Sequence, residues 1–253
     1  MAGMASTPGL GGEKAPSPPA PRRLPAPVRM AVLLFEGFEL LDVCAPAELL
    51  GAAGGGVAEL VFVSTEPGAP QVVSSTLGTQ GPALLGTHAI REGGNVARVG
   101  ADAQEEGFDF DALLVPGGAG VRREQHNEVL LRWLRDATRR AATRLVFSVC
   151  TGSWLLAAAG CLDGMRATSN QAALRAGHPQ RAGPATSWEL DRRWVEHWEG
   201  DTLFLTSAGV SAGGDAALRV VELLGGDAAG IAERAEWTRT GTAEDGEEAR
   251  PPP

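Results

Sequence analysis

RLVFSVCTGSWLLAAAG, residues 144–160, is the stretch that decides the fold. It reads as a short apolar strand from Leu145 to Val149, then Cys150, then an apolar helix that opens at Thr151-Gly152-Ser153. Small residues at such a junction allow the sharp strand-to-helix turn that presents a nucleophile. The free N–H groups and the dipole of a helix N-terminus favour the thiolate of Cys150. A buried structural cysteine is the alternative, because free cysteine is among the most buried residue types.

Outside this stretch, apolar strand-like runs alternate with helix-like runs. The other main strands are predicted at Arg29–Phe35, Ala58–Ser64, Phe108–Pro116 and Thr202–Ser207. Residues 67–100 are rich in Gly, Pro, Ser and Thr, so we expect only a hairpin or small strands there, with His88 in a loop. Alternation of this kind is typical of a mostly parallel sheet with helices on both faces.

The helix-like segments lie between these strands. After the first strand, one helical face is predicted from Leu40, Leu41, Val43, Leu49 and Leu50, with Pro46 near the start of the helix. Residues 127–142 are predicted to form an amphipathic helix whose apolar side includes Val129. Further helices are expected at Gln171–Ala176, Asp215–Leu224 and Asp227–Thr238, and a short strand in the region 166–170.

Three of the predicted strands end in loops that carry chemically useful residues. Sites in such sheets form at the carboxyl ends of the strands, and these loops bring Asp42, Gly117-Gly118 and Cys150 to that edge. Asp42 lies among apolar residues, so it is either a helix N-cap or a functional acid with a raised pKa. The glycine pair lets the backbone approach a ligand or another loop closely. It is not part of a dinucleotide fingerprint, and we expect no cofactor.

Composition excludes several classes of protein. The chain has 253 residues, a net charge of -9 and a pI of about 5.0, which argues against a nucleic-acid-binding surface. Its three cysteines include no C-x-x-C pair, which fits a reducing, cytoplasmic compartment and provides no zinc or other metal site. No apolar run is long enough to cross a membrane, and no secretory signal is recognisable. We expect disordered tails at residues 1–28 and 240–253 around a single domain at 29–239.

Four segments in order resemble the ThiJ/PfpI superfamily, a branch of the class I glutamine-amidotransferase-like fold, and within it the isonitrile hydratase-like group. They are FEGFELLDVCAPAELL (35–50), LLVPGGAGVR (113–122), VCTGSWLLAAAGCLDGMRAT (149–168) and TSAGVSAGGDAAL (206–218). The resemblance implies an α/β fold, a flavodoxin-like three-layer sandwich with a mostly parallel central sheet. It also implies a homodimer that acts on a small-molecule substrate.

The resemblance also assigns roles to individual residues. Cys150 would be the nucleophile, Asp42 the carboxyl beside it, and the backbone N–H groups of Gly118 and Thr151 an oxyanion site. A carboxyl that is hydrogen-bonded to a thiolate stabilises it and can deliver a proton, and two converging amides stabilise developing negative charge. With an isonitrile, the thiolate would attack the terminal carbon, and water would then release an N-substituted formamide.

One position departs from the family pattern. Many relatives carry a histidine after the R-A-T stretch, and Asn170 stands in that place here. A cysteine protease or amidotransferase needs an imidazole base, so those activities are disfavoured, whereas a hydratase that uses a Cys–Asp pair is less affected. Asn170, with Gly117, is a candidate for the substrate pocket; the alternative for Asn170 is a cap on a turn. Cys44 either lines the site or packs in the core.

Three functions remain open at this point. The first is isonitrile hydration, and the second is a glyoxalase-like conversion of a reactive dicarbonyl, which would use the same thiolate. Both predict that activity is lost in Cys150→Ser and Asp42→Asn. The third is a redox-sensing or ligand-sensing stress protein, whose thiol would oxidise without turnover of any small electrophile.

Overall fold

The computed structural model describes residues 22–54, 56–65, 71–75, 81–100 and 107–240. The disorder predicted for residues 1–21 and 241–253 lies outside the described residues. Residues 22–28, which the sequence assigned to a tail, belong to the folded domain: Leu24 is buried, and its N–H donates to the carbonyl of Leu223 at 3.0 Å. In the described part of the chain, no helix is long and apolar enough to cross a membrane.

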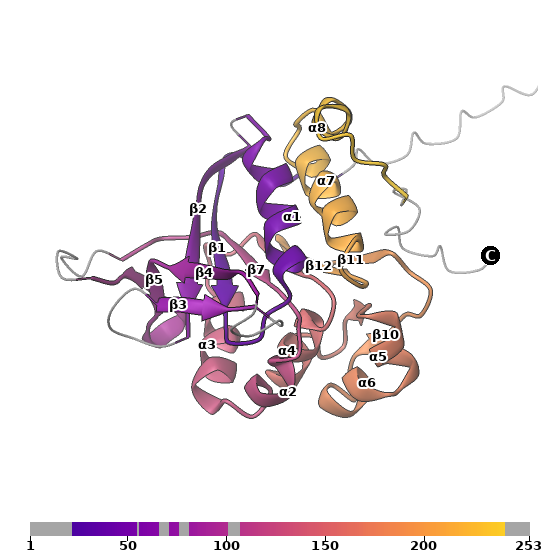
Figure 1. Ribbon diagram of the computed structural model, residues 1–253. Helices are drawn as coiled ribbons and strands as arrows, with labels where there is room; N and C mark the ends of the chain where they lie inside the picture. The colour runs from indigo at the N-terminus through magenta and orange to yellow at the C-terminus, as the bar shows by residue number, and fades with distance from the viewer. Residues whose placement is uncertain (1–21, 55, 66–70, 76–80, 101–106, 241–253) are drawn as a thin grey trace, which may run out of the picture.

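An eight-stranded, mostly parallel sheet forms the centre of the molecule (Figure 1). Its order is β11-β12-β8-β7-β1-β2-β5-β6. The five central strands are all parallel, and they are β12 (Thr202–Ser207), β8 (Leu145–Ser148), β7 (Ala112–Val115), β1 (Val28–Leu34) and β2 (Val57–Ser64). β5 (His88–Ile90) continues the parallel order, whereas the edge strands β6 (Val96–Arg98) and β11 (Trp194–Glu199) are antiparallel to their neighbours. Strands β7 and β8 and their neighbours β1 and β12 are almost fully buried. This is expected of continuous apolar runs in a parallel sheet that helices cover on both faces.

Helices cover both faces of this sheet and complete the three layers. α1 (Leu40–Gly51) and α7 (Ala212–Leu223) pack side by side on one face, with α8 (Ala228–Arg234) next to α7 (Figure 1). α2 (Val121–Glu124), α3 (Glu128–Thr138) and α4 (Gly152–Ala158) lie on the other. The short helices α5 (Gln171–Arg175) and α6 (His178–Ala182) follow, and α6 contacts α4. The predicted α/β sandwich with a mostly parallel sheet is confirmed.

Smaller elements complete the chain. β3 (Gln71–Ser74) and β4 (Ala83–Gly86) form the expected hairpin-like antiparallel pair, and β9 (Arg166–Ala167) pairs with β10 (Ser187–Trp188). A single turn of 3-10 helix, η2, covers Glu92–Gly94.

Helix α1 differs from the prediction at two positions. Pro46 lies inside the helix rather than near its start, where it removes one backbone hydrogen bond. Leu41 is 53% exposed, whereas its neighbour Asp42 is fully buried. The buried positions, Asp42, Val43, Pro46, Leu49 and Leu50, are spaced as one helical face. This face therefore carries a carboxyl into the interior in place of a leucine.

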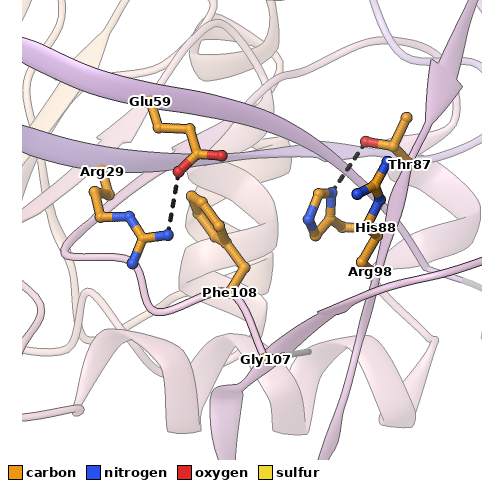
Figure 2. Close-up of a pocket in the computed structure, with 7 residues that line it drawn as sticks. All are labelled: Arg29, Glu59, Thr87, His88, Arg98, Gly107 and Phe108. Carbon is orange, nitrogen blue, oxygen red and sulfur yellow. Dashed lines mark hydrogen bonds and ion pairs between the residues drawn. The ribbon is translucent and has the colours of Figure 1, made fainter. Parts of the chain in front are cut away.

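Two further predictions are wrong in detail. Val129 is 65% exposed in α3, because the helix begins at Glu128 and buries the side that carries Leu130 and Trp133. His88 is in strand β5 and only 9% exposed, not in a loop. Its ring contacts Phe108 edge-to-face, and Figure 2 shows both residues in a cavity of about 440 Å³ that Arg29 also lines.

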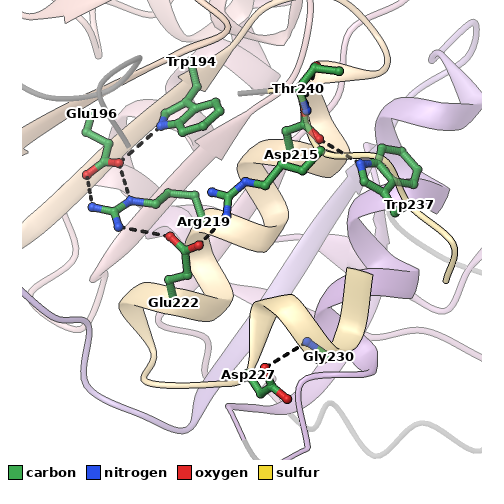
Figure 3. Close-up of polar contacts among 10 residues, drawn as sticks. Trp194, Glu196, Asp215, Arg219, Glu222, Asp227, Gly230, Trp237 and Thr240 are labelled. Carbon is green, nitrogen blue, oxygen red and sulfur yellow. Dashed lines mark hydrogen bonds and ion pairs between the residues drawn. The ribbon is translucent and has the colours of Figure 1, made fainter. Parts of the chain in front are cut away.

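The C-terminal segment is tied to helix α7 by a polar cluster (Figure 3). Asp215, fully buried at the start of α7, accepts hydrogen bonds from Trp237 Nε1 at 2.8 Å, Arg193 Nε at 2.5 Å and Thr240 Oγ1 at 3.0 Å. Burial raises the pKa of Asp215, but these hydrogen bonds and the charge of Arg193 outweigh it and hold the pKa below its ordinary value. Thr240, predicted to begin a disordered tail, is thus part of the fold.

Candidate active site

Cys150 occupies a sharp turn between β8 and α4. Its φ of 57° is in the left-handed region, which few residues other than glycine adopt. The turn is fixed by the Cys150 N–H, which donates to the Ala208 carbonyl at 2.9 Å, and by the Gly152 N–H, which donates to Val149. The Cys150 carbonyl accepts from the hydroxyls of Ser153 and Ser169. The junction predicted from the sequence therefore exists as a strained and well-supported turn.

Asp42 lies beside this turn in the first turn of α1. Its Oδ2 accepts a hydrogen bond from the Gly117 N–H at 2.9 Å. Its Oδ1 is buried and has no hydrogen-bond partner among the described residues. Gly117 has no space for a side chain, since a Cβ there would lie 2.5 Å from the Thr151 nitrogen and 3.0 Å from Asp42 Oδ2. The glycine thus allows three loops to meet at one carboxyl.

Burial raises the pKa of Asp42 from 3.8 to about 7. The hydrogen bond from Gly117 lowers it, the negative charge of Glu39 raises it, and the nearby Cys150 thiol lowers it. At neutral pH the carboxyl therefore exchanges a proton readily, which is the property of a general acid or base. A functional acid with a raised pKa was one of the two alternatives for Asp42; the N-cap of α1 is Glu39 instead.

Burial and, to a smaller extent, the charge of Asp42 raise the pKa of the Cys150 thiol to about 12. The Thr151 N–H, the Asn170 amide and the Thr151 hydroxyl lower it, but they do not compensate. The N–H group at the start of α4 favours the thiolate, as expected, but burial has the larger effect and the thiol is protonated at neutral pH. α4 has only seven residues, and the side chain is 6% exposed, so loss of solvation outweighs the helix dipole.

The two amides proposed for an oxyanion site have different environments. The Thr151 N–H lies close enough to the Cys150 sulfur to lower the pKa of the thiol. The Gly118 N–H donates to Thr151 Oγ1 at 3.0 Å. An oxyanion would have to displace this hydroxyl before it could reach the second amide.

Asn170 is a cap, which is one of the two alternatives considered for it, and it also contacts the thiol. Its Oδ1 accepts from the Ala173 N–H at 3.1 Å and caps helix α5. Its Nδ2 then faces the thiol and donates to Cys150 Sγ at 3.5 Å. The cap fixes the orientation of the amide, so the sulfur is offered a donor and not an acceptor.

A cavity of about 420 Å³ opens above Cys150. It is lined by Gly118, Thr151 and Asn170, by three alanines of α5 and its C-cap, and by four residues that the sequence did not mark: Glu39, Arg122, Trp154 and His178. The rings of Trp154 and His178 stack with an interplanar angle of 4°. Cys44 is not among the lining residues. No sequence signal singles out the four missed residues, which come from four separate segments.

The chain is similar to known proteins in both sequence and structure. The sequence profile of the DJ-1/PfpI family matches residues 28–223. An uncharacterized protein in the cpoL 5′ region of Streptomyces lividans is 35% identical over 146 residues, covering 57% of this chain and 88% of that protein. An isonitrile hydratase of Pseudomonas putida is 32% identical over 145 residues, again 57% of this chain but 53% of the hydratase, so only about half of its length is spanned. A crystal structure of a ThiJ/PfpI family protein from Pseudomonas syringae is 25% identical with a TM-score of 0.61, covering 88% of this chain and 82% of that chain.

The fold and the site define an α/β protein with a cysteine at a strand-to-helix elbow and a buried acid beside it. The chain belongs to the DJ-1/PfpI family.

Proposed function

We propose that the protein is a cysteine-dependent hydro-lyase that adds water to an isonitrile and releases an N-substituted formamide. One observation carries the proposal: a fully buried carboxyl with a pKa of about 7 and an unpartnered oxygen lies beside the thiol of Cys150. The similarity to an isonitrile hydratase supports it.

The raised pKa of Cys150 determines the first step. The thiol is protonated at rest, so Asp42 in its carboxylate form takes the proton as sulfur attacks the terminal carbon of the isonitrile. A carbon–sulfur bond forms, and the same proton passes from Asp42 to that carbon. The product is a thioimidate, in which the former isonitrile carbon carries one hydrogen and is doubly bonded to nitrogen.

Water completes the reaction in the second step. It adds to the thioimidate carbon, and its protons pass to nitrogen and, through Asp42, to the departing sulfur. The carbon–sulfur bond breaks, the formamide leaves and Cys150 regains its proton. Water is consumed once per cycle, and no redox change takes place.

The surroundings of the thiol fit this sequence without an imidazole base. Asn170 and the Thr151 N–H donate to sulfur and stabilise the negative charge that develops on it. Neither group is able to accept the thiol proton, which leaves that role to Asp42.

The test is turnover of a simple aromatic isonitrile, followed by the appearance of the formamide. We expect product from the wild type, none from Cys150→Ala, and at least a hundredfold loss in Asp42→Asn. Because the carboxylate form is required, kcat/KM should rise with pH up to about 7 and then level off. Absence of formamide from a folded wild-type protein, or unimpaired turnover in Cys150→Ala, would reject the proposal. Conversion of a dicarbonyl by that same protein would then favour the glyoxalase-like alternative.

A further inference from the structure

The cavity above Cys150 holds two opposite charges that do not pair with each other. Arg122 extends from α2, and Glu39 lies at the N-terminus of α1. Among the described residues, both make hydrogen bonds only through their backbone, and neither side chain makes a hydrogen bond or an ion pair. Unpaired charges on the wall of one small cavity are available to a ligand.

The two charges come from different elements of the site. Glu39, at the N-cap of α1, lies close enough to Asp42 for its charge to raise the pKa of that carboxyl. Arg122 lies in α2, which follows the Gly117-Gly118 loop. Helix α5 and its C-cap add an uncharged wall of Ala172, Ala173 and Ala176 to the same cavity.

We propose that Arg122 recognises a carboxylate on the substrate, so that the site takes a small electrophile with an anionic substituent. The electrophilic carbon would lie at Cys150, the uncharged part against α5, and the carboxylate on the guanidinium, which binds such groups through paired N–H donors. This specificity rests on the proposed function for the identity of the electrophile, but the role of Arg122 is testable without it.

Two alkylating agents that differ in charge provide the test. Iodoacetate and iodoacetamide are nearly the same size, and both transfer their carbon to a thiolate with loss of iodide. The rate of modification of Cys150 is measured by peptide mass spectrometry, which separates it from Cys44 and Cys161. The readout is the iodoacetate-to-iodoacetamide rate ratio for the full chain at low salt. A ratio cancels any change in thiol reactivity or in folding that affects both reagents equally.

In Arg122→Gln the ratio should fall about threefold to tenfold, because one favourable charge is removed. Arg132→Gln is the matched control, since this exposed arginine of α3 lies outside the cavity and its loss changes the net charge by the same amount. Its ratio should remain that of the wild type. High salt should lower the wild-type ratio towards that of Arg122→Gln. An unchanged ratio in Arg122→Gln, or an equal fall in Arg132→Gln, would overturn the assignment.

Kinetics with isonitriles separate this inference from the proposed function. If hydration occurs, Arg122→Gln should raise the KM for isocyanoacetate at least tenfold and leave the KM for its methyl ester within twofold. If no isonitrile is hydrated but the alkylation ratio still falls, the hydratase proposal fails and the anion site stands.

Discussion

At the scale of single residues, ionisation of Asp42 lowers the stability of the folded protein. A carboxyl with a raised pKa in the folded state binds its proton more tightly there than in the unfolded chain. Folding is therefore favoured fully below pH 4, and this contribution is lost as the pH rises from about 4 to about 7. The same ionisation that we propose for catalysis thus makes the native state less stable.

Asp42→Asn should reveal this cost. The asparagine can still accept from the Gly117 N–H but cannot ionise. Between pH 5 and pH 8, the free energy of unfolding of the variant should improve relative to the wild type by about 2–3 kcal/mol. Urea unfolding at both pH values measures the difference. Asp109→Asn, at a side chain that is 74% exposed, is the control and should show no such trend. An Asp42→Asn variant whose relative stability does not change with pH would contradict the raised pKa.

The residues of the site were only partly predictable from the sequence. Cys150 and Asp42 could be identified because each follows a recognisable strand and interrupts an apolar run. The state of the thiol could not, because local sequence indicates a helix N-terminus but not the burial that dominates the pKa. Arg122 and His178 come from separate segments, and only the tertiary fold places them at one cavity.

At the scale of elements, helix α5 is coupled to the thiol through one side chain. Asn170 caps α5 with its oxygen and donates to Cys150 with its nitrogen. Two substitutions separate these tasks, because aspartate is as good a cap as asparagine but replaces the donor by a negative charge.

We expect Asn170→Asp to keep the stability of the wild type within about 0.5 kcal/mol, and Asn170→Ala to lose about 1 kcal/mol. Both should slow the alkylation of Cys150 by iodoacetamide at neutral pH, and the aspartate variant should be slower, since added negative charge raises the pKa of the thiol. Asp227→Ala removes the corresponding cap of α8 and should lower stability without changing the alkylation rate. Faster alkylation in Asn170→Asp would show that the amide does not stabilise the sulfur.

The predicted elements were most accurate where strands are buried on both faces. The runs that became β1, β8 and β12 are largely apolar and almost fully buried, and such runs have few alternatives. Strand β11 was missed because Trp194–Glu199 mixes tryptophans with charged residues at a sheet edge. Its pairing with β12, rather than its own composition, makes it a strand.

At the scale of the whole molecule, Asp215 connects the C-terminal segment, helix α7 and the loop before β11. Its partners Trp237 and Thr240 follow α7 in the sequence (Figure 3), whereas Arg193 precedes it. The carbonyl of Arg193 accepts from Ala208, whose own carbonyl accepts from Cys150. A buried acid of α7 is thus linked to the backbone of the elbow.

Asp215→Asn should lower the free energy of unfolding by about 3 kcal/mol, because it removes one partner of a buried, hydrogen-bonded pair. Since the pKa of Asp215 is lowered in the fold, its contribution is present above pH 4 and is lost on further acidification. Chemical unfolding at pH 7 measures the loss. Asp191→Asn breaks a pair in which both side chains are more than half exposed and should cost less than about 1 kcal/mol. Equal losses in the two variants would show that burial of Asp215 has no special weight.

The hydrogen bond from Cys150 to Ala208 can form only after residue 208 has been synthesised. Strand β8 lies between β7 and β12, and β12 is made more than fifty residues after it. Until Thr202–Ser207 has left the ribosome, β8 has no partner strand on one side. The turn at Cys150 also lacks its hydrogen bond to Ala208. During that interval the thiol lacks the burial that later raises its pKa and shields it from oxidants. The elbow is thus among the last parts of the domain to be completed, although its sequence lies near the middle.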